Sequence, residues 1–360
     1  MPTRIAKSVG RFTHLAVAAS VLAVHDSKLP GTLGDQHPPV ALCFGSSVNG
    51  VADIGEENHR RFLSPEPVDL HPLGALEFTA HAATSHVAQL LEINGPATTI
   101  ASACTTGLDV VAWGAAQIQS GRSDIAIVGA SEAPLSEFLF AMFAATGFLS
   151  TWSGSPSKAS RPYDLLRSGL VLAEGAGALV LEEYARAVDR HAQIYAEIAG
   201  HASVSDGGLR GTRSDVYRRG LESALGWACR NAQIAHADLD YICAHANGTV
   251  DDAAETGAFK NVFQRSAYNI PISSIKSSIG HAMSAAALLQ VAAAALSIRD
   301  QVLPPTLHLD TADPQCDLDY VPHFSRRARV RTALLHAHSL GGVVPGSHAV
   351  LILTKPHDAL

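Results

Sequence analysis

Four residues of types that perform catalysis stand in short segments of small side chains: Cys104, His245, Lys276 and His281. Cys104 lies in SACTTG, just before a helix-like run, and the start of a helix lowers a thiol pKa. A lone cysteine is more often a small buried apolar residue. His245 directly follows a predicted strand, where loops often carry function, although a turn with a satisfied histidine reads the same way. Lys276 and His281 precede a very apolar helix, which a simple capped helix start also explains.

The composition is that of a folded chain with a large core. Of 360 residues, 47% are hydrophobic and 16% charged, and the formal charge of −7 comes without a basic stripe for nucleic acid. Five scattered cysteines without CxxC spacing indicate a reducing compartment, which favours a cytoplasmic protein. The 18 histidines form neither HExxH nor a Cys/His cluster, so the sequence predicts no metal site and no cofactor.

The segment 15–24 is apolar and follows three basic residues, which is the layout of a secretory signal. No small-x-small cleavage site follows it. We therefore interpret it as a buried or amphipathic helix, and we expect no membrane span.

Short β-rich runs alternate with alanine-rich helical ones, which is typical of an α/β fold with buried strands. The predicted strands are 40–44, 124–130, 178–182, 239–243 and 350–353, and the predicted helices are 107–120, 214–232, 252–264 and 281–299. The pattern of a β-like run, a small-residue loop and an apolar helix occurs twice, around Cys104 and around Lys276 and His281. We expect two similar halves, residues 1–208 and 209–360, divided near the glycine-rich stretch 203–212.

Several segments in one order resemble the elongating β-ketoacyl-[acyl carrier protein] synthases. They are SACTTG, the run SRPYDLLRSGLVLAEGAGALVLE (160–182), AHANGT with DAAE, KSSIGHAMSAAA, and LPPTLHLD with CDLDYVP (303–322). The resemblance covers roughly residues 10 to 358, far more than one motif. It implies the thiolase fold, two pseudo-symmetric α/β halves in an αβαβα arrangement, and a dimer that works with an acyl carrier protein. The strand 124–130 resembles the one that pairs across the family's dimer axis.

The resemblance implies a role for each candidate residue. Cys104 would accept the acyl group, His245 and His281 would complete a Cys-His-His set, Lys276 would support the second histidine, and Glu255 would belong to its network. A thiolate accepts an acyl group from a thioester at little cost. Two imidazole N–H donors would then stabilise the enolate that forms when a malonyl thioester loses CO₂. The backbone N–H groups of Cys104 and Gly342 would form the oxyanion hole.

Three departures from the family pattern stand out. The HGT-x-T pattern reads His245-Ala-Asn-Gly-Thr, so only Asn247 and Thr249 can contact the phosphopantetheine arm. The phenylalanine that gates the acyl pocket aligns with Gly342, which predicts an open pocket mouth. The family's first strand and glycine-rich turn have no counterpart, which predicts an edge or gap that another segment or a partner covers.

The sequence thus predicts an acyltransferase that makes 3-oxoacyl thioesters on a carrier protein, in fatty-acid or type II polyketide synthesis. The alternative is a non-condensing subunit of a heterodimer, similar to chain-length factors, but such subunits usually lose the cysteine. A thiolase or hydrolase acting on coenzyme A esters is a third class. Thiolases carry a second cysteine near the C-terminus. The last cysteine here is Cys316, and the absence of one after it counts against a thiolase.

Overall fold

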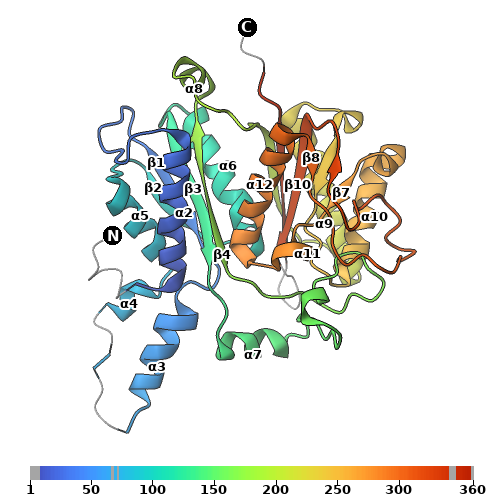
Figure 1. Ribbon diagram of the computed structural model, residues 1–360, viewed down its shortest axis with the longest axis horizontal. Coiled ribbons are helices and arrows are strands. Elements are labelled where there is room, and N and C mark those ends of the chain that lie inside the picture. Colours follow the sequence, from blue (N-terminus) through green and yellow to red (C-terminus); the bar gives the residue numbers. More distant parts are fainter. Residues whose placement is uncertain (1–8, 66–68, 71–72, 340–345, 358–360) are drawn as a thin grey trace. The chain divides into compact units, whose positions relative to one another are not determined.

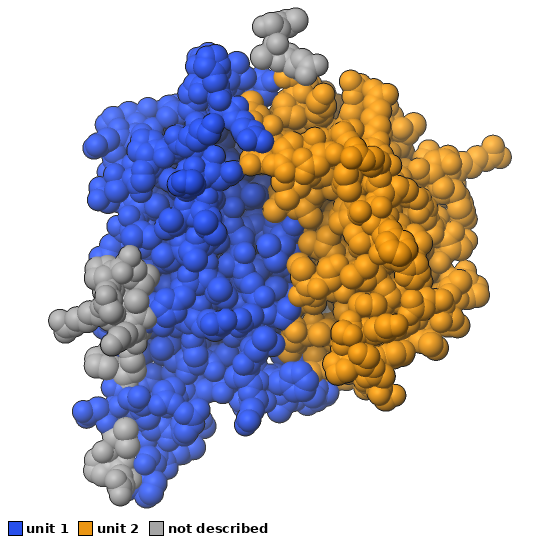
Figure 2. All heavy atoms as spheres, in the orientation of Figure 1, with its two compact units in different colours: residues 1–145, 173–193, 282–289 blue, residues 146–172, 194–281, 290–360 orange. Residues whose placement is uncertain are grey.

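A computed structural model describes residues 9–65, 69–70, 73–339 and 346–357 (Figure 1). Contacts group the chain into two units (Figure 2). The first unit contains residues 1–145, 173–193 and 282–289, and the second contains 146–172, 194–281 and 290–360. These units differ from the halves 1–208 and 209–360 expected from the sequence, because each contains segments from both sides of that boundary.

The first unit is built on a four-stranded sheet with the order β2-β1-β3-β4. Strands β1 and β2 are parallel, as are β1 and β3, whereas β4 is antiparallel to β3. The strands are β1 (Ala41–Gly45), β2 (Ala97–Ile100), β3 (Ile125–Glu132) and β4 (Gly175–Glu182). The helices are α2 (Arg11–Ser27), α3 (Glu56–Phe62), α4 (Gly74–Glu77), α5 (His81–Leu91), α6 (Thr106–Gln119), α7 (Glu137–Ala145) and α8 (Tyr184–Asp189).

The second unit is built on a five-stranded sheet with the order β5-β11-β10-β6-β7. The strands are β5 (Glu197–Ser205), β6 (Tyr241–Cys243), β7 (Ile272–Ser273), β10 (Thr332–Ser339) and β11 (Ser347–Thr354). The helices are α9 (Arg213–Ala232), α10 (Asp251–Phe263) and α11 (Lys276–Ile279). A separate ribbon pairs β8 (Val302–Leu303) with β9 (Arg326–Arg327), and α12 spans Met283–Asp300.

The two sheets repeat one plan, which confirms the predicted pair of similar α/β halves. In both, three strands run parallel, as β2-β1-β3 and as β7-β6-β10, and an antiparallel strand, β4 or β11, follows. Strand β5 extends the second sheet beyond β11. Among the described residues, no strand takes the equivalent place beside β4, in agreement with the family strand that has no counterpart in the sequence.

The predicted strands and helices are confirmed as elements. Residues 15–24 lie within α2, which packs against β3, β4 and α5 and buries a stripe that includes Phe12, Ala16 and Val24. The interpretation of this segment as a packed helix is therefore confirmed. Most of α12 is buried, as the absence of a polar face predicted, although Leu296 is exposed. Among the described residues, none of the helices has the length and hydropathy of a membrane span.

Candidate active site

Cys104 occupies a sharp turn between β2 and α6. The preceding residue, Ala103, has a φ of 54°, in the left-handed region that side chains with a Cβ rarely adopt. The chain turns through a short 3₁₀ segment (Ala103–Thr105) and enters α6, which leaves Cys104 buried at the start of a fourteen-residue helix. Such a position exposes a thiolate to the positive end of the helix dipole.

Side-chain hydrogen bonds hold this turn together. The Ser102 backbone N–H donates to Thr106 Oγ1 over 2.9 Å, and the Ser102 and Thr105 hydroxyls both donate to Asp109 Oδ2, at 2.5 and 3.0 Å. A Cβ on Gly107 would lie 2.3 Å from the backbone nitrogen of Leu288, so only glycine lets α6 pack this closely against α12. The position of Cys104 is therefore fixed by several local contacts.

The other four cysteines are buried and have less reactive thiols. Burial raises the pKa of Cys43 to about 12, of Cys229 to about 11 and of Cys316 to about 12, and it also raises the pKa of Cys243. A thiol with a raised pKa is a poor nucleophile at neutral pH. These four cysteines are therefore poor candidates for a nucleophile.

His245 follows the carboxyl end of β6, an edge where parallel strands present functional groups. Its Nδ1 accepts the backbone N–H of His338 over 3.1 Å, so the proton of the neutral ring lies on Nε2. Burial lowers the pKa of His245 well below its ordinary value, and the positive charge of Lys276 lowers it further. His245 is therefore a neutral imidazole with its N–H on the side away from β10.

His281 lies next to His245, with ring centroids 5.5 Å apart and planes nearly perpendicular. Its backbone N–H donates to the Val171 carbonyl over 2.7 Å. Both ring nitrogens are buried and have no hydrogen-bond partner within the described residues. Burial, followed by the charge of Lys276, lowers its pKa well below the ordinary value. A neutral, unpartnered ring at this point can donate a hydrogen bond to a bound group.

Lys276 is buried and supports His245 by a hydrogen bond to the backbone of that histidine. Its Nζ donates to the His245 carbonyl over 2.7 Å and to Gln290 Oε1 over 3.1 Å. The Gln290 amide donates in turn to the carbonyls of Cys243, Ala244 and His336. We did not predict Gln290 from the sequence, although a polar residue within the apolar run of α12 was a signal for it.

Glu255 lies on α10 and fixes the backbone around His245. Its two carboxylate oxygens accept the backbone N–H groups of His245 and Ala246, at 2.9 and 3.1 Å. Tyr163 donates its hydroxyl to Oε2 over 2.7 Å, and His336 Nδ1 lies 2.5 Å from Oε1. Burial raises the pKa of Glu255, and these donors oppose the shift. The residue thus joins the network of His245 rather than contacting His281 directly.

Asn247 and Thr249 occupy a buried turn that leads into α10. The Thr249 hydroxyl donates to Asn247 Oδ1 over 2.8 Å, and Asn247 Nδ2 lies 3.3 Å from His245 Nε2. Asp252 accepts the backbone N–H groups of Asn247 and Gly248, at 3.2 and 3.1 Å. Gly248 has a φ of 82°, which glycine adopts readily. The structure brings both residues together beside His245, and their contact with a phosphopantetheine arm stays a prediction.

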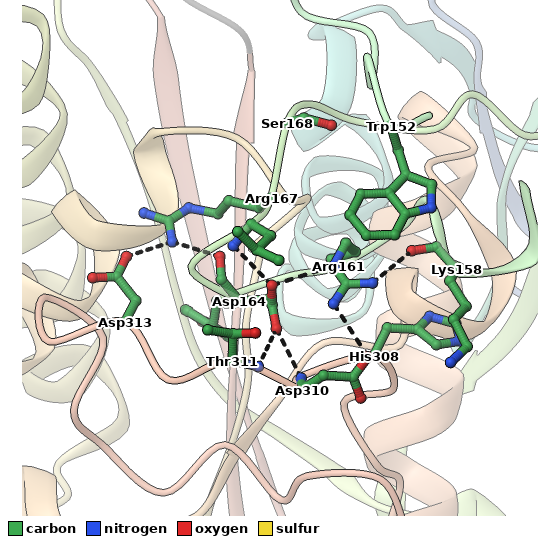
Figure 3. A network of polar contacts seen from close by, with 12 residues as sticks. Trp152, Lys158, Arg161, Asp164, Arg167, Ser168, His308, Asp310, Thr311 and Asp313 are labelled. Carbon is green, nitrogen blue, oxygen red and sulfur yellow. Dashed lines mark hydrogen bonds and ion pairs between the residues drawn. The ribbon is translucent and has the colours of Figure 1, made fainter. Parts of the chain in front are cut away.

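A polar network fixes the loop that precedes β4 (Figure 3). Asp164 Oδ2 accepts the backbone N–H groups of Asp310 and Thr311, at 2.7 and 2.6 Å, while its Oδ1 accepts Arg161 Nε over 3.2 Å. The guanidinium of Arg161 stacks on Trp152, 4.3 Å from the ring centroid. Burial would raise the pKa of Asp164, but hydrogen bonds from the Thr311 backbone and Arg161 outweigh it and lower the pKa.

Arg167 connects this network to the turn that carries Thr249. Its guanidinium pairs with Asp313 over 2.5 Å and donates to the Thr249 carbonyl over 2.9 Å. The Gly169 backbone N–H donates to the Gly248 carbonyl over 2.9 Å. The conspicuous run SRPYDLLRSG therefore positions the loop after β6.

A second cluster of buried polar groups, on β10 and β11 and at the end of β5, was not predicted from the sequence. The ring centroid of His348 lies 5.3 Å from that of His336 and 4.4 Å from that of His338. The Asp206 carboxylate lies 3.7 Å from His338 Nε2 and 3.4 Å from His348 Nε2. Burial lowers the pKa of His336 well below its ordinary value and that of His338 to about 4. Burial would raise the pKa of Asp206, but interactions with His338 and His348 outweigh it and lower the pKa.

The predicted oxyanion residue Gly342, which was also the predicted gate position, lies outside the described residues.

Comparison with known proteins identifies the family of the chain. Residues 1–187 match the family model described as the N-terminal domain of beta-ketoacyl synthase, and residues 195–310 match the model of its C-terminal domain. The chain is a member of the β-ketoacyl synthase family. The fold class predicted from the sequence, a thiolase-like α/β fold, is thereby confirmed.

Relatives come from both polyketide and fatty-acid systems. The tetracenomycin polyketide synthase ketoacyl synthase alpha subunit of Streptomyces glaucescens is 36% identical, over 99% of this chain and 83% of that protein. The 3-oxoacyl-[acyl-carrier-protein] synthase 2 of Coxiella burnetii is 35% identical, over 89% of this chain and 76% of that protein.

Among solved structures, a type II polyketide synthase acyl carrier protein in complex with its ketosynthase matches with a TM-score of 0.89. Its identity is 32%, over 98% of this chain and 86% of the other. The ishigamide ketosynthase/chain length factor matches with a TM-score of 0.87 and 30% identity, over 99% and 84% of the two chains.

Proposed function

We propose that the protein condenses an acyl group held on Cys104 with a malonyl unit on an acyl carrier protein, releasing CO₂ and a 3-oxoacyl-[acyl carrier protein]. The observation that carries this proposal is the pair of adjacent, buried, neutral imidazoles of His245 and His281. Two N–H donors on adjacent rings suit one developing oxyanion. They suit it better than a single histidine paired with a carboxylate, which serves to activate a nucleophile by removing its proton.

The first half-reaction is a transfer between two thiols. The Cys104 thiolate attacks the carbonyl carbon of an acyl thioester, the carbon–sulfur bond to the carrier breaks, and the departing thiolate takes up a proton. The backbone N–H groups of Cys104 and Gly342 would hold the oxygen that becomes negative. A cysteine at a helix start supports this role because its thiolate form is favoured there.

The second half-reaction requires the histidines. The bond between the malonyl carboxylate and its α-carbon breaks, CO₂ leaves, and the electron pair forms an enolate whose oxygen accepts N–H groups from His245 and His281. The enolate carbon then attacks the acyl-Cys104 carbonyl, and the cysteine thiolate leaves. The His338 backbone N–H supports this arrangement because it keeps the His245 proton on Nε2. The charge of Lys276 also supports it by opposing protonation of both rings.

The partners in this proposal are an acyl carrier protein and a second ketosynthase-like chain, either another copy or a related subunit.

The expectation that the strand 124–130 pairs across a dimer axis is wrong. That strand is β3, which is hydrogen-bonded to β1 on one side and to β4 on the other. Strand β2 lies at the edge of its sheet, and α7 exposes Phe138, Phe140 and Met142, which supports association through these elements.

The test separates the two half-reactions in the parent chain and in three variants. Acylation of the protein is followed by intact mass, and malonyl decarboxylation is followed by release of labelled CO₂. We expect His245→Ala and His281→Ala to reduce decarboxylation by about 10²–10³-fold each, with much smaller effects on acylation. His323→Ala, which changes a partly exposed histidine, is the control.

Two outcomes would contradict the proposal. Equal loss of acylation and decarboxylation in both variants would refute the division of roles between the cysteine and the histidines. A parent chain that performs neither half-reaction alone but raises the activity of a separate ketosynthase would identify the pairing-subunit alternative.

A further inference from the structure

Three side chains of metal-binding types meet at one end of the five-stranded sheet. His338 on β10 and His348 on β11 are directly paired residues of adjacent antiparallel strands, so both side chains lie on one face. Asp206 directly follows β5, which pairs with the other edge of β11. The three side chains are at most 5% exposed.

The spacing of their donor atoms fits one bound ion. Asp206 Oδ1 lies 3.4 Å from His348 Nε2, and Asp206 Oδ2 lies 3.7 Å from His338 Nε2. One donor atom from each residue can be chosen so that all three lie within 4.8 Å of one another. Ligands at about 2.0–2.2 Å from a shared tetrahedral ion are about 3.3–3.6 Å apart. Small side-chain adjustments therefore suffice to enclose an ion.

Two of these donor atoms lack a hydrogen-bond partner. Asp206 Oδ1 and His348 Nε2 are both buried, and neither forms a hydrogen bond within the described residues. Buried polar atoms nearly always have a partner, and leaving one unsatisfied is costly. The two atoms face each other, so a single cation between them satisfies both.

The protonation of the neighbouring ring leaves the His348 nitrogen available as a ligand. The Glu255 carboxylate accepts hydrogen bonds from two backbone N–H groups and from the Tyr163 hydroxyl. Its fourth contact is with His336 Nδ1. Because a carboxylate accepts and does not donate, we assign the His336 proton to Nδ1. His336 Nε2 is then an acceptor, and it lies 3.0 Å from His348 Nδ1, which must donate. The other ring nitrogen of His348, Nε2, lies on the side of Asp206, 3.4 Å from Oδ1. Metal-binding histidines are commonly oriented by such a donated hydrogen bond.

Two glycines keep side chains away from the donors. A Cβ on Gly220 would lie 2.1 Å from Asp206 Oδ1, and a Cβ on Gly346 would lie 2.8 Å from His338 Nε2. The ring of Tyr217 packs against both histidines, with centroids 4.4 Å from that of His338 and 4.7 Å from that of His348. An apolar ring at this distance limits the access of bulk water to a bound ion.

We propose that Asp206, His338 and His348 bind one divalent first-row transition-metal ion, for which zinc is the probe. Two imidazole nitrogens and one carboxylate are a ligand set that such ions accept, with a water molecule completing the coordination. The ion stabilises the junction of β5, β10 and β11. His338 also donates its backbone N–H to His245 Nδ1, so the ion holds in place the strand that fixes this ring. The site is independent of the proposed condensation, because it requires no substrate.

The test measures metal content of the full chain. The protein is treated with a chelator, exposed to zinc, separated by gel filtration and analysed by mass spectrometry of the metal. We expect about one tightly held zinc ion per chain. Asp206→Asn replaces the charged carboxylate with a weakly binding amide, and His348→Asn removes an imidazole; we expect both variants to lose this ion. His336→Gln keeps the ligands but removes their support, and it weakens zinc binding by about 10–100-fold. His59→Gln, at an exposed histidine of α3, retains the parent's metal content.

Cobalt substitution gives a second measurement that needs no variant. Co²⁺ bound by four or five ligands absorbs visible light far more strongly than hydrated, six-coordinate Co²⁺. The expected result is an intense visible band that zinc displaces. The proposal is overturned if the parent retains no metal, if its cobalt spectrum is that of the hydrated ion, or if Asp206→Asn and His348→Asn bind zinc as the parent does. The first result would identify a metal-free contact of Asp206 with the two histidines instead.

Discussion

Replacing Lys276 with methionine tests the network around His245 most directly. The change keeps much of the side-chain length and removes only the charged donor. The His245 carbonyl and Gln290 Oε1 then lose their partner in a buried region. Each unsatisfied acceptor costs about 1–3 kcal/mol, or about 2–6 kcal/mol together. The folded state no longer has to bury an ammonium group, which offsets part of this cost, so we expect a loss of about 2–3 kcal/mol in unfolding free energy.

The same variant changes the titration of both histidines. The positive charge of Lys276 contributes to the low pKa values of His245 and His281, after burial itself. Its removal therefore raises both pKa values toward the ordinary range. Protonation of His245 Nδ1 breaks its hydrogen bond with the His338 backbone, and the ring no longer holds its position. As the pH is lowered, malonyl decarboxylation by Lys276→Met should therefore begin to decrease at a higher pH than decarboxylation by the parent.

The assay compares the pH dependence of decarboxylation in the parent, in Lys276→Met and in Lys260→Met. Lys260 pairs with Asp317 at the surface, so its replacement removes the same charge from an exposed position. Denaturant unfolding of the three proteins gives the stability change. An acidic limb of decarboxylation that does not move in Lys276→Met, with reduced stability, would refute the electrostatic role and leave only a structural one.

Three further predictions concern the cysteines, the loop network and pH. Limiting iodoacetamide should label Cys104 in peptide maps, because burial raises the pKa of the other thiols; labelling mainly elsewhere would refute its assignment as the nucleophile. Asp164→Asn should destabilise the chain by about 2–4 kcal/mol in denaturant unfolding, since a neutral amide cannot accept all the donors that converge on this carboxylate; an unchanged midpoint would contradict this. Stability should fall as pH drops below about 6.5, because His245 and His281 take up protons there only in the unfolded chain; equal unfolding free energies at pH 7.5 and about 5.5 would show that their folded pKa values are not depressed.

The sequence supported the local parts of this description. Periodicity and composition predicted the α/β class and the helices that became α6, α9, α10 and α12, because these features depend on neighbours within a few turns. The order of motifs also identified Cys104, His245, Lys276 and His281 as candidates. Of these, the structure brings His245, Lys276 and His281 together in one unit. It also shows Cys104 at a helix start, as the helix-like run after it predicted.

The contacts between distant segments could not be obtained in this way. The strand 124–130 was assigned to a dimer axis by resemblance, yet its two neighbours in the sheet leave no edge free for a partner strand. Pairing partners of a strand lie anywhere in the chain, so a strand's own residues do not state whether it is central or at an edge.

Sequence alone determined which residue types stand at helix starts and strand ends, since those positions follow from local hydrophobic patterns. Only the tertiary structure decided which of them share an environment. His338 and His348 lie on β10 and β11, Asp206 directly follows β5, and no spacing in the chain indicates that the three meet. The same holds for Gln290, whose amide connects three carbonyls. Protonation is also a property of the fold, because burial and the Lys276 charge keep His245 neutral, and a backbone N–H from β10 decides which of its nitrogens carries the proton.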